Sequence, residues 1–139
     1  MNDKHMFEAA KECSKNATYE GSCHVRVGCV IAYKGTILAK GWNTNKTHPM
    51  QAHYNKYRFQ QKGGHYFPEK CHAEMQALTK IKYLDIDYND VHVYVYRQFK
   101  DGKYAISRPC PACMKAIRSL GINKIHYTTN DGLAFEKLV

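Results

Sequence analysis

The sequence has 139 residues, few acidic residues, little proline and no long apolar run. A membrane-spanning helix needs about 20 mostly apolar residues, and no stretch of about 18 is present, so we expect no membrane span. The first five residues lack the apolar segment of a secretory signal, and we therefore expect a cytoplasmic protein. No internal repeat, linker or low-complexity segment interrupts the chain, which predicts one domain over residues 1–139.

Acidic residues are outnumbered by basic ones, 12 against 21, which gives a formal charge of +9. This excess indicates an anionic partner, and nucleic acid, a nucleotide and a membrane surface all carry the required charge. A basic protein without any special partner is the alternative. The hydrophobic fraction of 44% is high enough to form a core, so general disorder is not expected.

Hydrophobic periodicity predicts the element order helix, strand, strand, helix, strand, helix, strand, strand. Lys34-Gly35 is a turn signal that joins the first two strands in a hairpin. Asn130-Asp131-Gly132 leaves room only for a tight turn, so the last two strands are predicted to be antiparallel. The expected helices are 5–17, 72–83 and 110–120, and the expected strands are 27–33, 36–39, 91–96, 122–128 and 133–139.

The six cysteines indicate metal binding rather than a disulfide scaffold, because the chain is long enough to fold without disulfides and shows no export signal. Cys110 and Cys113 form a C-x-x-C pair at the start of a predicted helix, a spacing that redox motifs share. His72 begins another predicted helix. One histidine and two cysteines are the three protein ligands of a catalytic zinc site with a fourth position for water. Glu74 lies close enough along the chain to reach that water.

The H-x-E motif of His72-Ala73-Glu74, followed by P-C-x-x-C at 109–113, resembles the cytidine deaminase-like superfamily. The similarity covers Cys71 to Leu78 and Ser107 to Cys113. It implies an α/β fold with three α/β/α layers and a five-stranded mixed sheet. It also implies Zn²⁺ bound by His72, Cys110 and Cys113. Hydrolytic removal of an amine would then use Glu74 as the catalytic proton carrier. A purely structural zinc is the alternative, but it would need a fourth ligand and would leave Glu74 without a role.

The resemblance implies four further substrate contacts. Asn43 follows the second strand, where such deaminases often place an asparagine that binds the sugar; an ordinary turn asparagine is the alternative. The backbone around Ala73 and Ser107 is expected to contact the edge of the base. Tyr127 is expected to stack on the base, or to be an ordinary half-buried strand residue.

The substrate is only partly determined by these motifs. The core His72-Ala73-Glu74-Met75 and Ser107 look most like deoxycytidylate deaminases, whereas the tight turn at 130–132 looks more like nucleoside and polynucleotide deaminases. The leading hypothesis is deamination of a cytosine nucleotide or nucleoside, dCMP-like, to the uracil product and ammonia. One alternative is a cytosine or adenine deaminase that acts on single-stranded DNA or RNA. The other is a non-catalytic zinc-containing nucleic-acid-binding module.

Residues 43–70 form a basic and aromatic insertion whose two ends lie at the predicted site, as expected of a lid or substrate-recognition loop. Its side chains suit a polynucleotide, a single 5′-phosphate, or solvent. The sequence leaves open a homo-oligomer and a second, structural zinc. The residues available for that zinc are Cys23, His24, His48, His53, His65 and Cys71.

Overall fold

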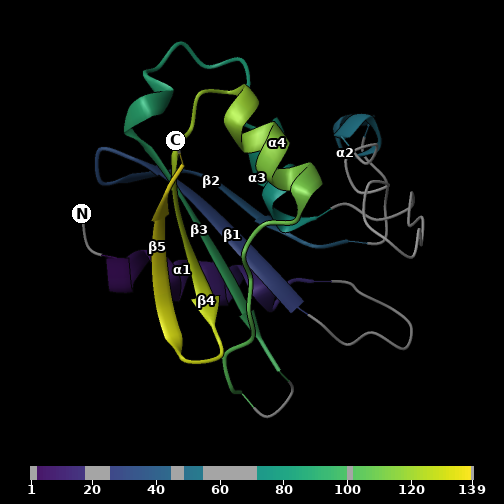
Figure 1. Cartoon of the computed structure of the whole chain (residues 1–139), viewed down its shortest axis with the longest axis vertical. Helices are drawn as coiled ribbons and strands as arrows, with labels where there is room; N and C mark the ends of the chain where they lie inside the picture. The colour runs from purple at the N-terminus through teal and green to yellow at the C-terminus, as the bar shows by residue number, and fades with distance from the viewer. Residues whose placement is uncertain (1–2, 18–25, 45–48, 55–71, 100–101, 139) are drawn as a thin grey trace.

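The structure, a computed structural model, describes residues 3–17, 26–44, 49–54, 72–99 and 102–138. It contains a five-stranded sheet flanked by helices (Figure 1). The elements in chain order are α1 (Asp3–Ser14), β1 (Arg26–Tyr33), β2 (Thr36–Trp42), α2 (Pro49–Tyr54), α3 (Ala73–Thr79), the short 3-10 helix η2 (Tyr88–Asp90), β3 (Val91–Gln98), α4 (Pro111–Ser119), β4 (Lys124–Thr129) and β5 (Gly132–Lys137).

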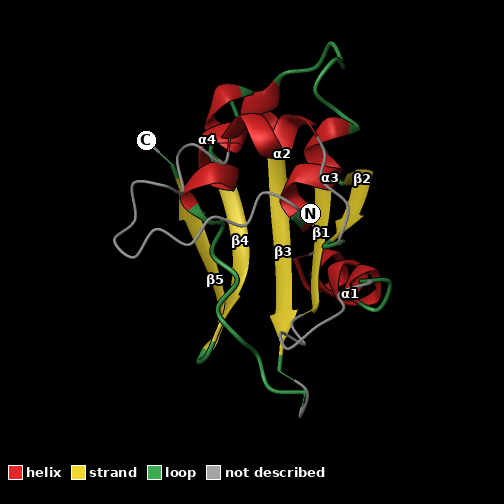
Figure 2. Cartoon of the chain, turned by 90° about the vertical axis from the view of Figure 1, so that its right-hand side faces the viewer, coloured by secondary structure: helices red, strands yellow, loops and turns green. Residues whose placement is uncertain are grey.

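The sheet is mixed, with the strand order β2-β1-β3-β4-β5 (Figure 2). β1 is antiparallel to both β2 and β3, β3 is parallel to β4, and β4 is antiparallel to β5. The only parallel pair is joined through α4, since parallel neighbours need a crossover connection. These pairings confirm the predicted mixed five-stranded sheet and its antiparallel C-terminal hairpin.

Tight turns form both hairpins where the sequence predicts them. Lys34 and Gly35 have φ angles of 50° and 83°, the left-handed conformation at both central positions that twists like the flanking strands. At the other hairpin Thr129 Oγ1 bonds both the Gly132 carbonyl and the Asp131 amide. The chain therefore reverses within two residues, which leaves no room for a crossover helix between β4 and β5.

Alternating side chains separate the two faces of the sheet. Val30 and Tyr94, which pair across β1 and β3, face α1, whereas their neighbours Cys29 and Val95 face α3 and α4. In Figure 1, α1 passes behind β1 and β3. Helices on both faces of one sheet confirm the three-layer α/β/α architecture.

The observed element ends differ from the predicted ones by a few residues. The helix predicted at 72–83 is α-helical only to Thr79, after which the amides of Lys80 and Ile81 bond carbonyls three residues back and the helix tightens. Thr79 also bonds its own helix backbone at Gln76 O, as helix-terminal hydroxyls do. β2 extends to Trp42 rather than ending at residue 39, because pairing with β1 continues beyond the apolar run. Periodicity does not report such pairing. The described part of the 43–70 insertion adds one short helix, α2, to the predicted elements.

Two glycines let helices approach the sheet more closely than any side chain would permit. A Cβ atom at Gly28 of β1 would lie 1.9 Å from the carbonyl oxygen of Ala10 in α1. A Cβ atom at Gly41 of β2 would lie 2.3 Å from the carbonyl oxygen of Ala73 and 2.8 Å from the amide nitrogen of Ala77, both in α3. The first turn of α3 is therefore held directly against the end of β2.

A histidine pair lies on the α1 face of the sheet, opposite Cys110 and Cys113. His92 Nδ1 and His126 Nε2 are 2.8 Å apart, and His126 Nδ1 lies 4.0 Å from Asp3 Oδ2. Asp3 also accepts a bond from the Tyr94 hydroxyl at 2.6 Å. Burial lowers the pKa of His126 to about 4, with Asp3 opposing the shift and His92 adding to it. Both rings are therefore neutral at pH 7.

None of the helices in the described part of the chain is both long enough and apolar enough to cross a membrane.

We expect the His126 pair to make the protein less stable as the pH falls. The pKa of His126 is lower in the folded state than the unfolded value of about 6.5, so below that pH the unfolded chain gains a proton that the native state excludes. The contribution is complete above pH 6.5 and is lost as the pH falls toward 4. Between pH 7.5 and 5, denaturant titrations should show a loss in the free energy of unfolding about 1–2 kcal/mol larger for wild type than for His126→Gln. His5→Gln, at an exposed position of α1, is the control. Equal losses in wild type and His126→Gln would contradict the prediction.

We also expect Gly41→Ala to displace α3. The added methyl group would collide with backbone atoms of Ala73 and Ala77, which cannot rotate away, and overpacking of this kind costs about 1–3 kcal/mol or more. Thermal unfolding should show a lower Tm for this variant. Lys40→Ala changes the preceding, exposed side chain of β2 and should leave the Tm nearly unchanged. A Gly41→Ala protein as stable as wild type would show that the helix and strand are not packed at contact distance.

Candidate metal and catalytic site

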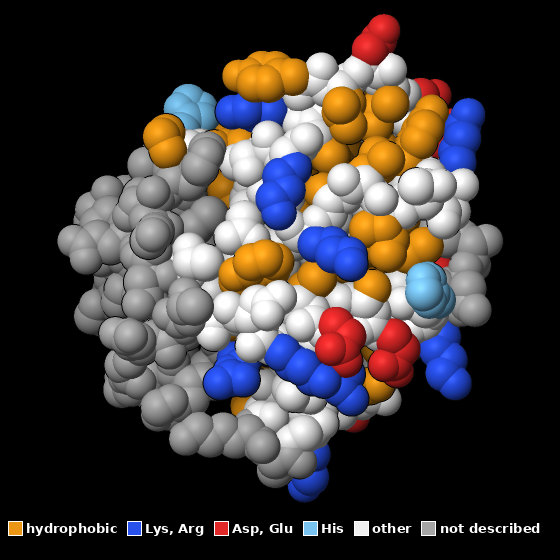
Figure 3. Space-filling view, turned by 180° about the vertical axis from the view of Figure 1, so that it is seen from behind, with side chains coloured by type: hydrophobic (Ala, Val, Ile, Leu, Met, Phe, Trp, Pro, Cys, Tyr) orange, Lys and Arg blue, Asp and Glu red, His pale blue; other side chains and the backbone are white. Residues whose placement is uncertain are grey.

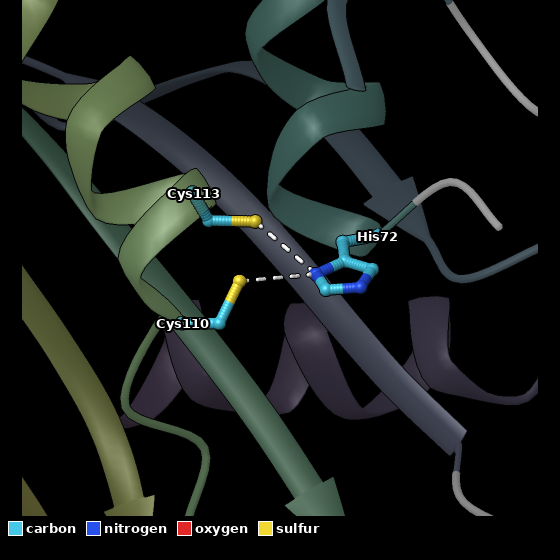
Figure 4. A group of neighbouring side chains, drawn as sticks. All are labelled: His72, Cys110 and Cys113. Atoms are coloured by element: carbon cyan, nitrogen blue, oxygen red, sulfur yellow. Dashed lines mark hydrogen bonds between the residues drawn. The ribbon is translucent and has the colours of Figure 1, made fainter. Parts of the chain in front are cut away.

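Three side chains from two helix starts converge at one point (Figure 4). His72 Nδ1 lies 3.3 Å from the sulfur of Cys113 and 3.5 Å from the sulfur of Cys110. One ligand atom from each residue lies within 4.8 Å of the others. Among the described residues this is the one cluster of three or more histidine, cysteine or acidic side chains able to hold a metal ion. The structure thus brings together the three residues that the sequence predicts as ligands.

Local backbone conformation explains the convergence. His72 and Cys110 are the N-cap residues of α3 and α4, with extended ψ angles of 154° and 166°, and neither side chain caps its own helix. Each side chain instead points toward the other helix (Figure 4). Pro111 occupies the first turn of α4, where its missing amide costs nothing, and Cys113 follows one turn after Cys110.

The protonation pattern of the two thiols suits a soft cation. Hydrogen bonds from Cys113 and His72 lower the pKa of Cys110 to about 3, although burial opposes the shift. The pKa of Cys113 is raised well above its usual value, because its thiol serves as the donor to Cys110 and is buried. Cys110 is therefore already a thiolate. A divalent cation that displaced the proton of Cys113 would hold that sulfur as a thiolate too. Two thiolates and one imidazole are a known set of zinc ligands.

Glu74 lies in the first turn of α3 and is 5% exposed. Burial raises the pKa of its carboxyl group, while the nearby His72 opposes the shift. Cys113 forms a hydrogen bond with the same carboxylate and also lowers its pKa. A buried carboxyl group with a raised pKa can accept and return a proton as a general base and acid. The predicted catalytic residue therefore lies within bonding reach of the predicted metal ligands.

Two residues at the site have roles that sequence reasoning did not assign. Cys29 of β1 is fully buried beneath the site, where burial and then the Glu74 charge raise the pKa of its thiol. Gln76 accepts a hydrogen bond from the Trp42 amide at 3.0 Å and so ties α3 to the end of β2. Strand alternation could have identified Cys29, but Gln76 has no comparable signal. Cys13 of α1 is buried in the core on the other face of the sheet.

The side chain of Asn43 takes part in the sheet edge. Its side-chain Oδ1 accepts a hydrogen bond from the Val27 amide at 2.9 Å, and the backbone N–H of Asn43 donates to the Val27 carbonyl at 3.4 Å. This geometry holds Asn43 on the strand end next to the site. It also shows that the carboxamide has a structural task, as the turn-asparagine alternative requires.

Ser107 and Ala73 are both buried beside the metal cluster. Ser107 Oγ donates to the Val95 carbonyl at 2.9 Å and accepts the Thr128 amide at 2.8 Å, while the Ser107 amide donates to the Thr128 carbonyl. These bonds fix the segment that leads to Cys110. Because the Ser107 amide is used within the protein, its carbonyl is the group that remains for the expected base contact.

Tyr127 is half-buried on β4, on the same face as Val95. Its hydroxyl donates to Glu136 at 3.1 Å, and Glu136 also forms a two-pronged ion pair with Arg108 at 2.9 and 3.0 Å. The hydrogen bonds from Arg108 hold the pKa of Glu136 below its usual value. The ring of Tyr127 is thus anchored at its outer end. The expectation that it stacks on a base stays a prediction.

Most of the 43–70 insertion lies outside the described residues, as do Cys23, His24, His48, His65 and Cys71 of the predicted second zinc. His53 is described, in α2, and its ring contacts Tyr54 edge-on at 4.8 Å. The second zinc and the role of the insertion therefore stay predictions.

Comparison with known proteins agrees with this geometry. Residues 1–129 match the family described as the cytidine and deoxycytidylate deaminase zinc-binding region. No curated protein sequence matches the chain. Solved structures share its fold at low identity.

Three of these solved structures are deaminases. The dCMP deaminase of cyanophage S-TIM5, in complex with dCMP and dUMP, is 23% identical with a TM-score of 0.58, over 91% of this chain and 80% of that one. Cytidine deaminase from Burkholderia pseudomallei is 16% identical with a TM-score of 0.65, over 99% and 93%. Guanine deaminase from Bacillus subtilis is 22% identical with a TM-score of 0.50, over 93% and 65%.

The family match covers nearly the whole chain, and the His72-Cys110-Cys113 cluster fits the Zn²⁺ for which the family region is named. The three-layer fold and the buried Glu74 carboxylate beside the cluster agree with the resemblance found in the sequence motifs. This chain belongs to the family of zinc-binding cytidine and deoxycytidylate deaminases.

Proposed function

We propose that this protein catalyses the zinc-dependent hydrolytic deamination of a cytosine nucleotide or nucleoside, with dCMP as the leading substrate. The observation that carries the proposal is the buried Glu74 carboxylate beside a three-ligand cluster. Three protein ligands leave a tetrahedral zinc with one open position. A structural zinc would have four ligands and no need for a buried acid.

His72, Cys110 and Cys113 would hold the ion. Zinc in such a site lowers the pKa of a water molecule to about 7 and so supplies a nucleophile for the carbon that bears the exocyclic amine. Two thiolates from α4 and one imidazole from α3 would fix the ion between the helices, directly above the sheet.

Glu74 is proposed to carry the protons. Its carboxylate would take one proton from the attacking water and deliver it to the ring nitrogen. It would then take the remaining proton from the added hydroxyl group and pass it to the amine, which leaves as ammonia as the carbonyl forms. Burial raises the pKa of this carboxyl group above its usual value, which brings it closer to the pKa of a water molecule activated by zinc. Efficient proton transfer requires such matching.

Asn43, Ala73, Ser107 and Tyr127 are proposed to hold the substrate. Asn43 would bind the sugar, the backbone at Ala73 and Ser107 would contact the base edge, and Tyr127 would stack on the ring. Support comes from their positions on the strands and helix starts that surround the ligand cluster. The similar phage enzyme was crystallised with dCMP and dUMP, which favours the nucleotide.

A polynucleotide is the second candidate substrate, and a bound single strand would follow a continuous basic groove with aromatic platforms. Figure 3 shows the α1 face of the sheet, opposite the ligand cluster, where Lys and Arg side chains are scattered among apolar and uncharged ones. We also propose that residues 1–139 form one domain, in which β5 is the last strand of the sheet.

The substrate assignment predicts turnover of dCMP or deoxycytidine by the zinc-loaded protein, measured as ammonia release. Glu74→Gln should lower kcat by about 100-fold or more while zinc stays bound, because the proton carrier is lost and the ligands remain. Glu8→Gln, an exposed acid on α1, should match wild type. Turnover of a cytosine-containing oligonucleotide alone, or a Glu74→Gln protein as fast as wild type, would contradict the proposal.

The metal assignment predicts one zinc ion per chain, measured by elemental analysis. Cys110→Ser should lose most of the metal, because a serine hydroxyl is a far weaker ligand than the thiolate that it replaces. Cys13→Ser removes a buried thiol on the opposite face of the sheet and should keep the zinc. If both variants retained one equivalent, Cys110 would not be a ligand.

A further inference from the structure

The structure brings Arg97 to the edge of the proposed substrate site. Strand register pairs Arg97 of β3 with Val27 of β1, and Val27 bonds in turn to Asn43 beyond β2. Cross-strand neighbours lie on the same face of a sheet. Val27 packs against the core under α3 and α4, so all three residues lie on the face that carries the ligand cluster.

The position along the strand is equally specific. Val95, two residues before Arg97, pairs with both Cys29 and Tyr127 and bonds Ser107. Two residues of a strand span about 7 Å. Arg97 therefore lies about 7 Å farther along β3 than Val95, in the next row of side chains toward the end of the strand. A nucleoside with its base over the Val95 row and its sugar at Asn43 would extend its 5′ end into the row of Arg97.

The guanidinium of Arg97 is held in place but incompletely bonded. One terminal nitrogen donates to the Ile106 carbonyl at 3.2 Å. The Nε atom is buried and lacks a hydrogen-bond partner. No carboxylate in the described ranges forms an ion pair with Arg97. A donor that is shielded from water and lacks an acceptor is costly to keep, so this charge is available to an anionic ligand.

We propose that Arg97 binds the phosphate group attached to the reacting nucleoside and thereby makes the enzyme prefer nucleotides over free nucleosides. Arginine suits this task because Nε and one terminal nitrogen form a planar edge that donates two parallel bonds to phosphate oxygens. The bond to Ile106 would orient that edge in advance. The inference rests on the proposed deaminase function and assigns its substrate class.

The test compares kinetics on dCMP, deoxycytidine and a cytosine-containing oligonucleotide. Arg97→Ala should raise KM for dCMP by tenfold or more and leave kcat/KM for deoxycytidine within twofold of wild type. Arg97→Lys should restore part of the affinity for dCMP, because the charge is kept. A loss confined to the oligonucleotide would overturn the assignment, because it would place Arg97 on a phosphodiester backbone and not on the phosphate of a mononucleotide.

Arg26→Ala is the matched control. Arg26 precedes Val27 on β1, so its exposed side chain lies on the opposite face of the sheet, and its removal changes the net charge equally. This variant should keep the wild-type KM and kcat/KM on both dCMP and deoxycytidine. A dCMP KM that is unchanged in Arg97→Ala would overturn the inference. Equal losses on dCMP and deoxycytidine would also overturn it, because they would show that Arg97 acts only by holding Ile106.

A binding measurement separates this inference from the proposed function. If wild-type protein deaminates none of the three substrates, the proposed function fails. Titration of the zinc-loaded protein with dUMP and with deoxyuridine then tests Arg97 by itself. A preference for dUMP that disappears in Arg97→Ala would support the phosphate contact. Equal binding of dUMP by both proteins would refute it.

Discussion

The backbone contact between α3 and β2 at Gly41 is the constraint on which the site depends. Because no Cβ atom separates them, the Ala73 carbonyl and the Ala77 amide lie directly against the strand. Gln76 strengthens this contact through the Trp42 amide. The start of α3 carries both a metal ligand and the acid, so a shift of this helix by the width of a methyl group would separate them from the cysteines of α4. Catalytic geometry generally tolerates much less.

The parallel pairing of β3 and β4 sets the second half of the site. A parallel neighbour requires a crossover, and α4 is the helix of that crossover. The segment that leads to it is fastened by Ser107 to Val95 and Thr128, on both strands of the parallel pair. These hydrogen bonds therefore fix the position of Cys110 relative to the sheet. The two helix starts meet because each is fixed separately to the same sheet.

Burial gives the site its chemical character. Cys29 and Val95 form an apolar floor, and the Glu74 carboxylate above it is taken out of water, which raises its pKa. The same withdrawal from water would be unfavourable for two neighbouring thiols and an acid without a cation. The hydrogen bond between the two thiols lowers the pKa of Cys110 and raises that of Cys113. A divalent ion would compensate all these charges at once, which links metal binding to the stability of the site.

The element order, both hairpins, and the grouping of His72, Cys110 and Cys113 with Glu74 close by could be predicted from the sequence alone. These features are local: Lys34-Gly35 adopts its turn without distant help, and His72-x-Glu74 and Cys110-x-x-Cys113 each lie within one helical turn. The contacts between residues far apart in the chain became visible only in the tertiary structure. The approach at Gly41, the floor at Cys29, the bond of Asn43 to Val27 and the position of Arg97 all depend on strand register and helix packing. Such contacts join residues far apart in the chain, and no local pattern of hydrophobicity or spacing encodes them.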